Sequence, residues 1–257
     1  MLDFVPQPVR TELDAPAPAS PAATAIGGSR AVAAVEVVLA SGLPTQLALG
    51  ALIMLMGLPP LDANGHLSMA FVATVLAADT VVLLALIAWR LHEGGEGVRP
   101  LMLGSGRWTR EAGVGLALIP LAFGGVALLM AALRWAWPWL HNVEANPFET
   151  LARSPGDAAL LLALVVVSGG LKEEFQRAFI LHRFEQSLGG ARAGLAIYSV
   201  VFGAGHMIQG YDVGIATMLL GFIWGLVFLR RRSIVAPAVC HAGFNAAQVV
   251  QFIISGG

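Results

Sequence analysis

Three short polar clusters interrupt the apolar second half of the chain, and their side chains are of the kinds that catalyse hydrolysis. They are Glu173-Glu174-Phe175-Gln176-Arg177, Phe202-Gly203-Ala204-Gly205-His206 and His241-Ala242-Gly243-Phe244-Asn245. A carboxylate can take a proton from water, whereas histidine and asparagine can bind a metal or donate hydrogen bonds to an oxyanion. Together, on three separate helices, these clusters contain the side chains that a hydrolytic site needs.

The spacing of the first cluster divides its two glutamates. On a helix, Glu173 and Arg177 are i,i+4 neighbours, and Glu174 and Arg177 are i,i+3 neighbours. Arg177 can therefore pair with one carboxylate while the other points about 100° away around the helix axis. This arrangement suits a paired, structural acid beside a free general base.

Each cluster also has a structural explanation when it is taken alone. A Glu-Glu-x-x-Arg cluster is often a salt-bridge patch, and an intramembrane histidine often joins two helices by a hydrogen bond. Glu36 and Asp79 have no obvious partner in the sequence, so we expect interfacial exposure or simple packing for both. The pair Gly221 and Gly225 predicts close helix packing.

The elements that must position these residues are membrane helices. Hydrophobic residues make up 57% of the chain and charged residues 12%, against about 45–50% and about 25% in soluble domains. Apolar runs near the ~20 residues that span a bilayer predict an all-α bundle of seven to eight transmembrane spans. The runs are 31–58, 68–91, 111–134, 156–184, 190–208, 213–229 and 233–254, and Gly169-Gly170 can break the fourth.

The chain divides into three parts. Residues 1–30 are rich in proline and alanine and lack the basic and apolar regions of a signal peptide, so we predict a disordered tail. Residues 31–140 hold the N-terminal transmembrane helices, and residues 145–254 hold the three clusters. The single cysteine, Cys240, excludes a disulfide framework, and no basic tract indicates a nucleic-acid partner.

The positions of the cations predict the orientation in the membrane. Most of the 15 Lys and Arg residues fall in the tail and in the second, fourth and sixth connections between the runs. We assign Arg183 to the fourth connection. The connections on the opposite side hold only Arg134 and Arg153. This bias predicts an integral membrane protein, of a cell inner membrane, with a cytoplasmic N-terminus. Lys172 and Arg177 lie inside a span and need a separate explanation.

The order of the three clusters resembles that of the CAAX protease and bacteriocin-processing (CPBP, or Abi) family of intramembrane proteases, which includes the type II CAAX prenyl endopeptidases. The resemblance covers about residues 145–254, which would form the catalytic helical core. One departure concerns the first motif, which in the family is Glu-Glu-x-x-x-Arg. Aligning on Arg177 places Lys172 and Glu173 at the two glutamate positions, whereas aligning on the glutamate pair, which we prefer, shifts Arg177 by about 100°.

The resemblance implies an endopeptidase that cleaves a membrane-associated protein or peptide within or at the bilayer. Its catalytic residues would be Glu173, Glu174, Arg177, His206, His241 and Asn245, with Glu173 activating water. His206 and His241 would ligate Zn²⁺, or the histidines and Asn245 would stabilise the oxyanion without a metal. The His-Glu-x-x-His and Gly-x-Ser-Gly signatures are absent, which excludes the corresponding intramembrane protease classes.

Two other functions remain open at this level. A non-proteolytic immunity or scaffold protein can keep the same fold, and the shortened first motif is compatible with it. A proton-coupled transporter can use a glutamate pair as a relay. The lack of an internal repeat and the presence of His and Asn donors disfavour the transporter.

Overall fold

The named secondary-structure elements are all helical in the part of the chain that the computed structural model describes, residues 29–104, 106–144 and 146–255. The α-helices are α1 (Arg30–Ala40), α2 (Leu43–Leu55), α3 (Met69–Glu93), α4 (Val98–Leu103), α5 (Trp108–Ala136), α6 (Pro155–Leu164), α7 (Glu173–Ser187), α8 (Ala191–Gly205), α9 (Tyr211–Arg231) and α10 (Val235–Ser255). Three short 3₁₀ helices, η3 (Pro138–Leu140), η4 (Glu149–Leu151) and η6 (Met207–Gln209), and one π-helix, η5 (Val165–Lys172), complete the fold. The all-α prediction is confirmed. Of the predicted tail, residues 1–28 lie outside the described residues, whereas Ser29 caps α1 and Arg30 is its first residue.

The helices account for all seven predicted runs. By length and composition, α3, α5, α8 with η6, α9 and α10 can each cross a membrane, and α1 with α2 forms a sixth candidate bent by 47°. The fourth run corresponds to α6, η5 and α7, which follow one another without a gap from Pro155 to Ser187. The predicted integral membrane protein is therefore confirmed.

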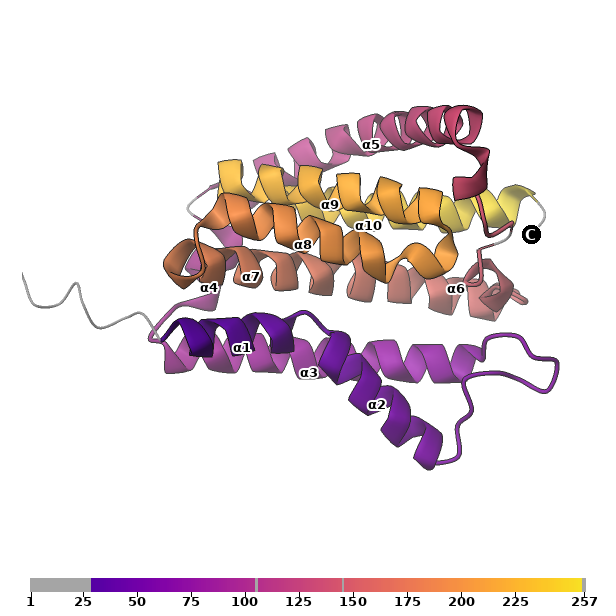
Figure 1. Cartoon of the computed structure of the whole chain (residues 1–257), viewed down its shortest axis with the longest axis horizontal. Coiled ribbons are helices and arrows are strands. Elements are labelled where there is room, and N and C mark those ends of the chain that lie inside the picture. The colour runs from indigo at the N-terminus through magenta and orange to yellow at the C-terminus, as the bar shows by residue number, and fades with distance from the viewer. Residues whose placement is uncertain (1–28, 105, 145, 256–257) are drawn as a thin grey trace, which may run out of the picture.

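The bend between α1 and α2 has a local cause. Gly42 adopts a φ of +82°, in the left-handed region that favours glycine, and Pro44 then opens α2. The Ser41 hydroxyl donates to the Val38 carbonyl, 2.7 Å away, at the end of α1. As a result α2 diverges from the rest of the bundle, as Figure 1 shows.

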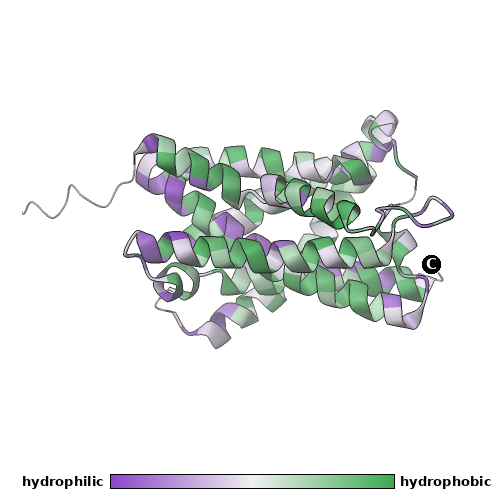
Figure 2. Ribbon diagram, turned by 90° about the horizontal axis from the view of Figure 1, so that it is seen from below, coloured by the Kyte–Doolittle hydropathy of each residue, from purple (hydrophilic) through white to green (hydrophobic). Residues whose placement is uncertain are grey.

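The helix that carries the glutamate pair lies at the centre of the molecule. In Figure 1, α1–α3 form one side, α5 lies on the opposite side, and α7–α10 fill the space between them. Residues Ala178 to Leu181 of α7 are almost fully buried and join a core cluster with residues of α1, α3, α4, α8 and α9. Figure 2 shows apolar residues along the middle of the helices and many hydrophilic ones near their ends, which fits a bilayer.

The contacts of Glu36 and Asp79 correct the prediction for both residues. Glu36 is buried and accepts a hydrogen bond from Arg90 Nη2, 2.5 Å away, and another from Arg183. Asp79 is fully buried and pairs with Lys172 Nζ at 2.8 Å. Arg183, assigned to a connection, lies inside α7 and is buried. Both carboxylates thus have cationic partners, but these lie at least 54 residues away along the chain.

Candidate active site

The two adjacent glutamates occupy different environments at the start of α7. Glu174 and Arg177 are 1% and 0% exposed, and they form an ion pair one turn apart. Glu173 is 21% exposed and lies outside this ion pair, with its Oε2 3.8 Å from His241 Nε2. The expected division of the two carboxylates is therefore present in the geometry.

Arg177 is held by aromatic rings as well as by Glu174. Its guanidinium carbon lies 5.3, 5.1 and 5.6 Å from the ring centroids of Tyr198, Phe202 and Trp224. A cation over an aromatic face is attracted by the ring quadrupole, and the attraction grows when both groups are desolvated. The Arg177 charge is therefore stabilised by one carboxylate and three rings, which come from α8 and α9.

His241 connects α10 to the glutamate pair. Its Nδ1 lies 2.9 Å from Glu174 Oε1, and its Nε2 lies 3.8 Å from Glu173 Oε2. The Trp224 ring stacks on the imidazole with a centroid separation of 3.8 Å. Because a buried carboxylate only accepts hydrogen bonds, the contact assigns the proton to Nδ1 and leaves Nε2 facing Glu173.

His206 lies at the C-terminal end of α8 and shares one neighbour with His241. Its Nδ1 is 2.8 Å from the carbonyl oxygen of Phe202, which fixes the ring. The Phe202 ring centroid is 4.8 Å from that of His206 and 6.1 Å from that of His241, the latter edge-on. Phe202 thus contacts both histidines, so the second cluster is brought to the same part of the bundle.

Asn245 lies one turn beyond His241 and contacts the π-helix. Its Nδ2 points at the Val165 carbonyl, 3.5 Å away. A Cβ on Gly169 would lie 2.6 Å from this nitrogen, and one on Gly170 would lie 2.4 Å from the Cβ of Ala242. The two glycines, named above as a possible break in the fourth run, let η5 pass close to α10 while the helical winding continues.

The predicted zinc ligands, His206 and His241, are each held by a contact with the protein. Within the described residues, no three or more His, Cys, Asp or Glu side chains form a group that could hold a metal ion. His206 and His241 each use Nδ1 for a contact with the protein, to Phe202 and Glu174 respectively. Such contacts leave Nε2 of each ring available as a ligand, but within the described residues no third side chain groups with the two histidines to complete a zinc site. Zn²⁺ therefore stays a prediction, and no step below uses it.

Four of the six predicted site residues lie in one contact network: Glu173, Glu174, Arg177 and His241. His206 joins it through Phe202, and Asn245 lies one helical turn away on α10. Sequence reasoning missed Tyr198 and Trp224, because nothing in an apolar run distinguishes an aromatic residue beside a buried charge from one in the core.

Comparison with known proteins identifies the segment that holds this network. Residues 155–247 match a family model described as type II CAAX prenyl endopeptidase Rce1-like. This match confirms the predicted family resemblance. Neither a curated protein nor a solved structure matches the chain.

Proposed function

We propose that this membrane protein, whose residues 155–247 match the Rce1-like type II CAAX prenyl endopeptidases, is an intramembrane endopeptidase that hydrolyses a peptide bond of a membrane-associated protein or peptide. One observation carries the proposal: Glu174 is buried and paired with Arg177, whereas Glu173 is 21% exposed and lies outside that ion pair. Adjacent carboxylates in such different environments are suited to different roles.

Glu173 is the general base in this account. It takes a proton from a water molecule, whose oxygen then forms a bond to the carbonyl carbon of the peptide. The carbonyl oxygen becomes an oxyanion in the tetrahedral intermediate. When the C–N bond breaks, the protonated Glu173 returns its proton to the departing amine nitrogen, and the oxyanion reforms the carbonyl of a new carboxyl group.

Glu174 and Arg177 position the other groups. Glu174 holds His241 through Nδ1, so that Nε2 faces the carboxylate of Glu173 at 3.8 Å. A buried carboxylate on Nδ1 also stabilises the imidazolium form of a histidine. In that form Nε2 carries a proton and can donate a hydrogen bond to the oxyanion. Arg177 balances the negative charge of Glu174 beside the otherwise apolar core.

His206 and Asn245 have further polar atoms to which we assign a part in the reaction. Because His206 uses Nδ1 to reach the Phe202 carbonyl, its Nε2 is left for substrate or water. Asn245 has an amide that can donate to an oxyanion if it leaves its long contact with Val165. A peptide bond or water presented between α8 and α10 would therefore meet an acceptor nitrogen of His206 on α8 and a donor amide of Asn245 on α10.

The proposed substrate is a polypeptide that already lies in or on the membrane. Beside α7, the site is built from α8, α9 and α10, which by length and composition can cross a bilayer, so we expect its substrate to reach it from that environment. We place the protein in a cell inner membrane with a cytoplasmic N-terminus, as the cation distribution favours.

The proposal can be tested by comparing membrane polypeptides from cells with the wild-type protein, with none, and with Glu173→Gln. We expect the same uncleaved polypeptides to accumulate in the second and third cells, and His206→Ala to behave similarly. If the three variants Glu173→Gln, Glu174→Gln and His206→Ala each process these polypeptides as the wild type does, hydrolysis is not the function. A scaffold or immunity role would then account for the fold.

A further inference from the structure

Helix α7 has a second polar face, on the side away from Glu174 and Arg177. Lys172, Gln176 and Arg183 are spaced i, i+4 and i+11, so they lie along one stripe of the helix. Gln176 Nε2 donates to the Ala40 carbonyl at 2.8 Å, and Arg183 donates to Glu36. Together with the Lys172–Asp79 pair, these contacts form a polar seam between α7 and the helices α1 and α3.

The Lys172–Asp79 pair is the most buried part of the polar seam. The two side chains are 2% and 0% exposed, and their charged atoms lie 2.8 Å apart. Asp79 also accepts hydrogen bonds from Thr45 Oγ1 at 2.7 Å and from Gln46 Nε2 at 3.1 Å. Removing either partner would leave an uncompensated charge in an apolar interior, which is strongly unfavourable.

Lys172 is also the last residue of the π-helix η5, directly before Glu173. A π-helix closes i→i+5 hydrogen bonds and therefore accommodates an extra residue relative to an α-helix. A shift of α7 by one residue would rotate its side chains by about 100°. Such a shift would bring Glu173 or Phe175 to the place that Glu174 occupies opposite His241, and it would also carry Arg177 away from its present place. A contact that fixes the rotational register is therefore needed at this point.

We propose that the Lys172–Asp79 ion pair is a positioning device that sets the register of α7. It keeps Glu174 against Arg177 and His241, and it leaves Glu173 as the accessible carboxylate. A register role is the best-attested use of a buried polar pair in a helical assembly. Asp79 lies on α3, outside the residues that match the family, so the N-terminal helices take part in building the site.

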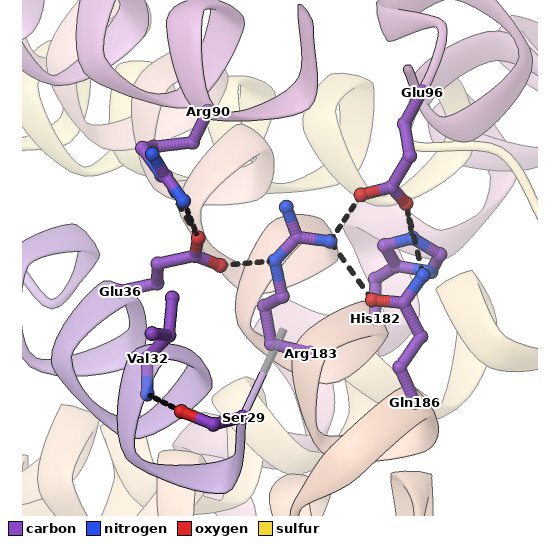
Figure 3. Close-up of polar contacts among 8 residues, drawn as sticks. All are labelled: Ser29, Val32, Glu36, Arg90, Glu96, His182, Arg183 and Gln186. Atoms are coloured by element: carbon purple, nitrogen blue, oxygen red, sulfur yellow. Dashed lines mark hydrogen bonds and ion pairs between the residues drawn. The ribbon is translucent and has the colours of Figure 1, made fainter. Parts of the chain in front are cut away.

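The opposite end of the polar seam provides a matched control. Arg183 lies between Glu36 and Glu96, with His182 and Gln186 also on Glu96, as Figure 3 shows. This end is eleven residues from Lys172, roughly 16 Å along the helix at 1.5 Å per residue. Glu36→Gln therefore makes the same carboxylate-to-amide change as Asp79→Asn in the same seam, but far from Glu173.

The first readout needs no substrate and so does not depend on the proposed function. In a Cys240→Ala background, Glu173→Cys places the only thiol at the position of the exposed carboxylate, where a water-soluble maleimide should label it. We expect Asp79→Asn to change this labelling rate several-fold, Glu36→Gln to leave it unchanged, and the charge swap Lys172→Asp with Asp79→Lys to restore it. An unchanged rate in Asp79→Asn would overturn the inference.

The second readout rests on the proposed endopeptidase activity and is made with Glu173 in place. A displacement of about 1 Å in a catalytic group can cost about 100-fold in rate, so we expect Asp79→Asn to lower kcat by about that factor with KM little changed. The charge swap should recover most of it. A wild type without hydrolytic activity would contradict the proposed function, whereas the labelling result would still decide the register role.

A variant without unpaired charges covers the case in which Asp79→Asn does not fold. Lys172→Met with Asp79→Leu removes both charges, and apolar replacement of a buried ion pair is often neutral for stability. We expect this folded double variant to show the same altered labelling at residue 173. Wild-type labelling together with wild-type kcat would mean that the pair only fills space.

Discussion

Glu174 Oε1 lies 2.9 Å from His241 Nδ1, which joins two helices across 67 residues of sequence. The same oxygen contacts Arg177, so one carboxylate orients a histidine and neutralises a buried arginine. Its neighbour Glu173 takes no part in that ion pair and faces the other ring nitrogen of His241. The two adjacent carboxylates therefore have different partners and different roles.

The two glutamates should differ in their effect on stability. Glu174→Gln leaves Arg177 as a buried charge without its carboxylate, and breaking a buried pair costs about 3–5 kcal/mol. Glu173→Gln removes no ion pair with Arg177. We expect thermal unfolding in detergent to give a clearly lower Tm for Glu174→Gln and a wild-type Tm for Glu173→Gln. Equal Tm values for the two variants would contradict the assigned roles.

Arg177→Lys should destabilise the protein although it keeps the charge. A lysine cannot present a planar guanidinium to Tyr198, Phe202 and Trp224, and each such contact is worth about 0.5–2 kcal/mol. The Tm should fall, whereas Arg230→Lys, at an exposed position near the end of α9, should leave it unchanged. Identical Tm values for the two variants would show that the charge alone matters at residue 177.

Gly170→Ala should disrupt the approach of the π-helix to α10. The new methyl group would lie 2.4 Å from the Cβ of Ala242 and 2.7 Å from its Cα. At these distances the clash can be relieved only if the backbone shifts. We expect reduced activity and a lower Tm, and partial recovery when Ala242→Gly is added. Gly124→Ala, on α5 with nothing within 4 Å, is the matched control and should be neutral or stabilising. If the double variant shows no recovery, the effect of Gly170→Ala does not come from its contact with Ala242.

The contribution of Glu96 to stability should depend on pH. Burial raises the pKa of Glu96, but hydrogen bonds from His182 and Arg183 outweigh it, so that the pKa lies below its ordinary value. A carboxyl group whose pKa is lowered by folding stabilises the protein above the unfolded pKa of about 4.3 and loses this contribution as the pH falls through the folded value. The difference in Tm between wild type and Glu96→Gln should thus be full at neutral pH and shrink in acid. A Tm difference between wild type and Glu96→Gln that stays constant into acid would contradict this assignment. So would an equal Tm difference for Glu144→Gln, a change at an exposed glutamate.

Much of the fold could be predicted from the lengths of the apolar runs. Each predicted run contains helix, because in a bilayer the backbone polar groups must be satisfied within the segment. The bend at Gly42 and the π-helix at Gly169-Gly170 could not be predicted, since glycine permits several backbone conformations. At Gly169 and Gly170 the conformation depends on α10, whose Asn245 and Ala242 pack on them, whereas Gly42 lies against Gln176 and Leu83.

The site was predictable as a set of residues but not as a geometry. The spacing of Glu173, Glu174 and Arg177 allows either carboxylate to pair, and the choice of Glu174 depends on His241 and on the aromatic rings around Arg177. Lys172 was conspicuous as a charge inside a span, yet its partner Asp79 is 93 residues away. No local pattern joins two charges at that separation.

The central claim is that Glu173 activates water for peptide hydrolysis, and it can be measured directly in proteoliposomes. A polypeptide that accumulates uncleaved in cells without the protein is incubated with purified protein in H₂¹⁸O, and mass spectrometry reads the new C-terminal carboxyl group. We predict one ¹⁸O atom there for the wild type and for Glu185→Gln, a change in a largely exposed ion pair with Arg232. For Glu173→Gln we predict a rate lower by about 10²–10⁴-fold. Cleavage by Glu173→Gln at the wild-type rate would contradict the account.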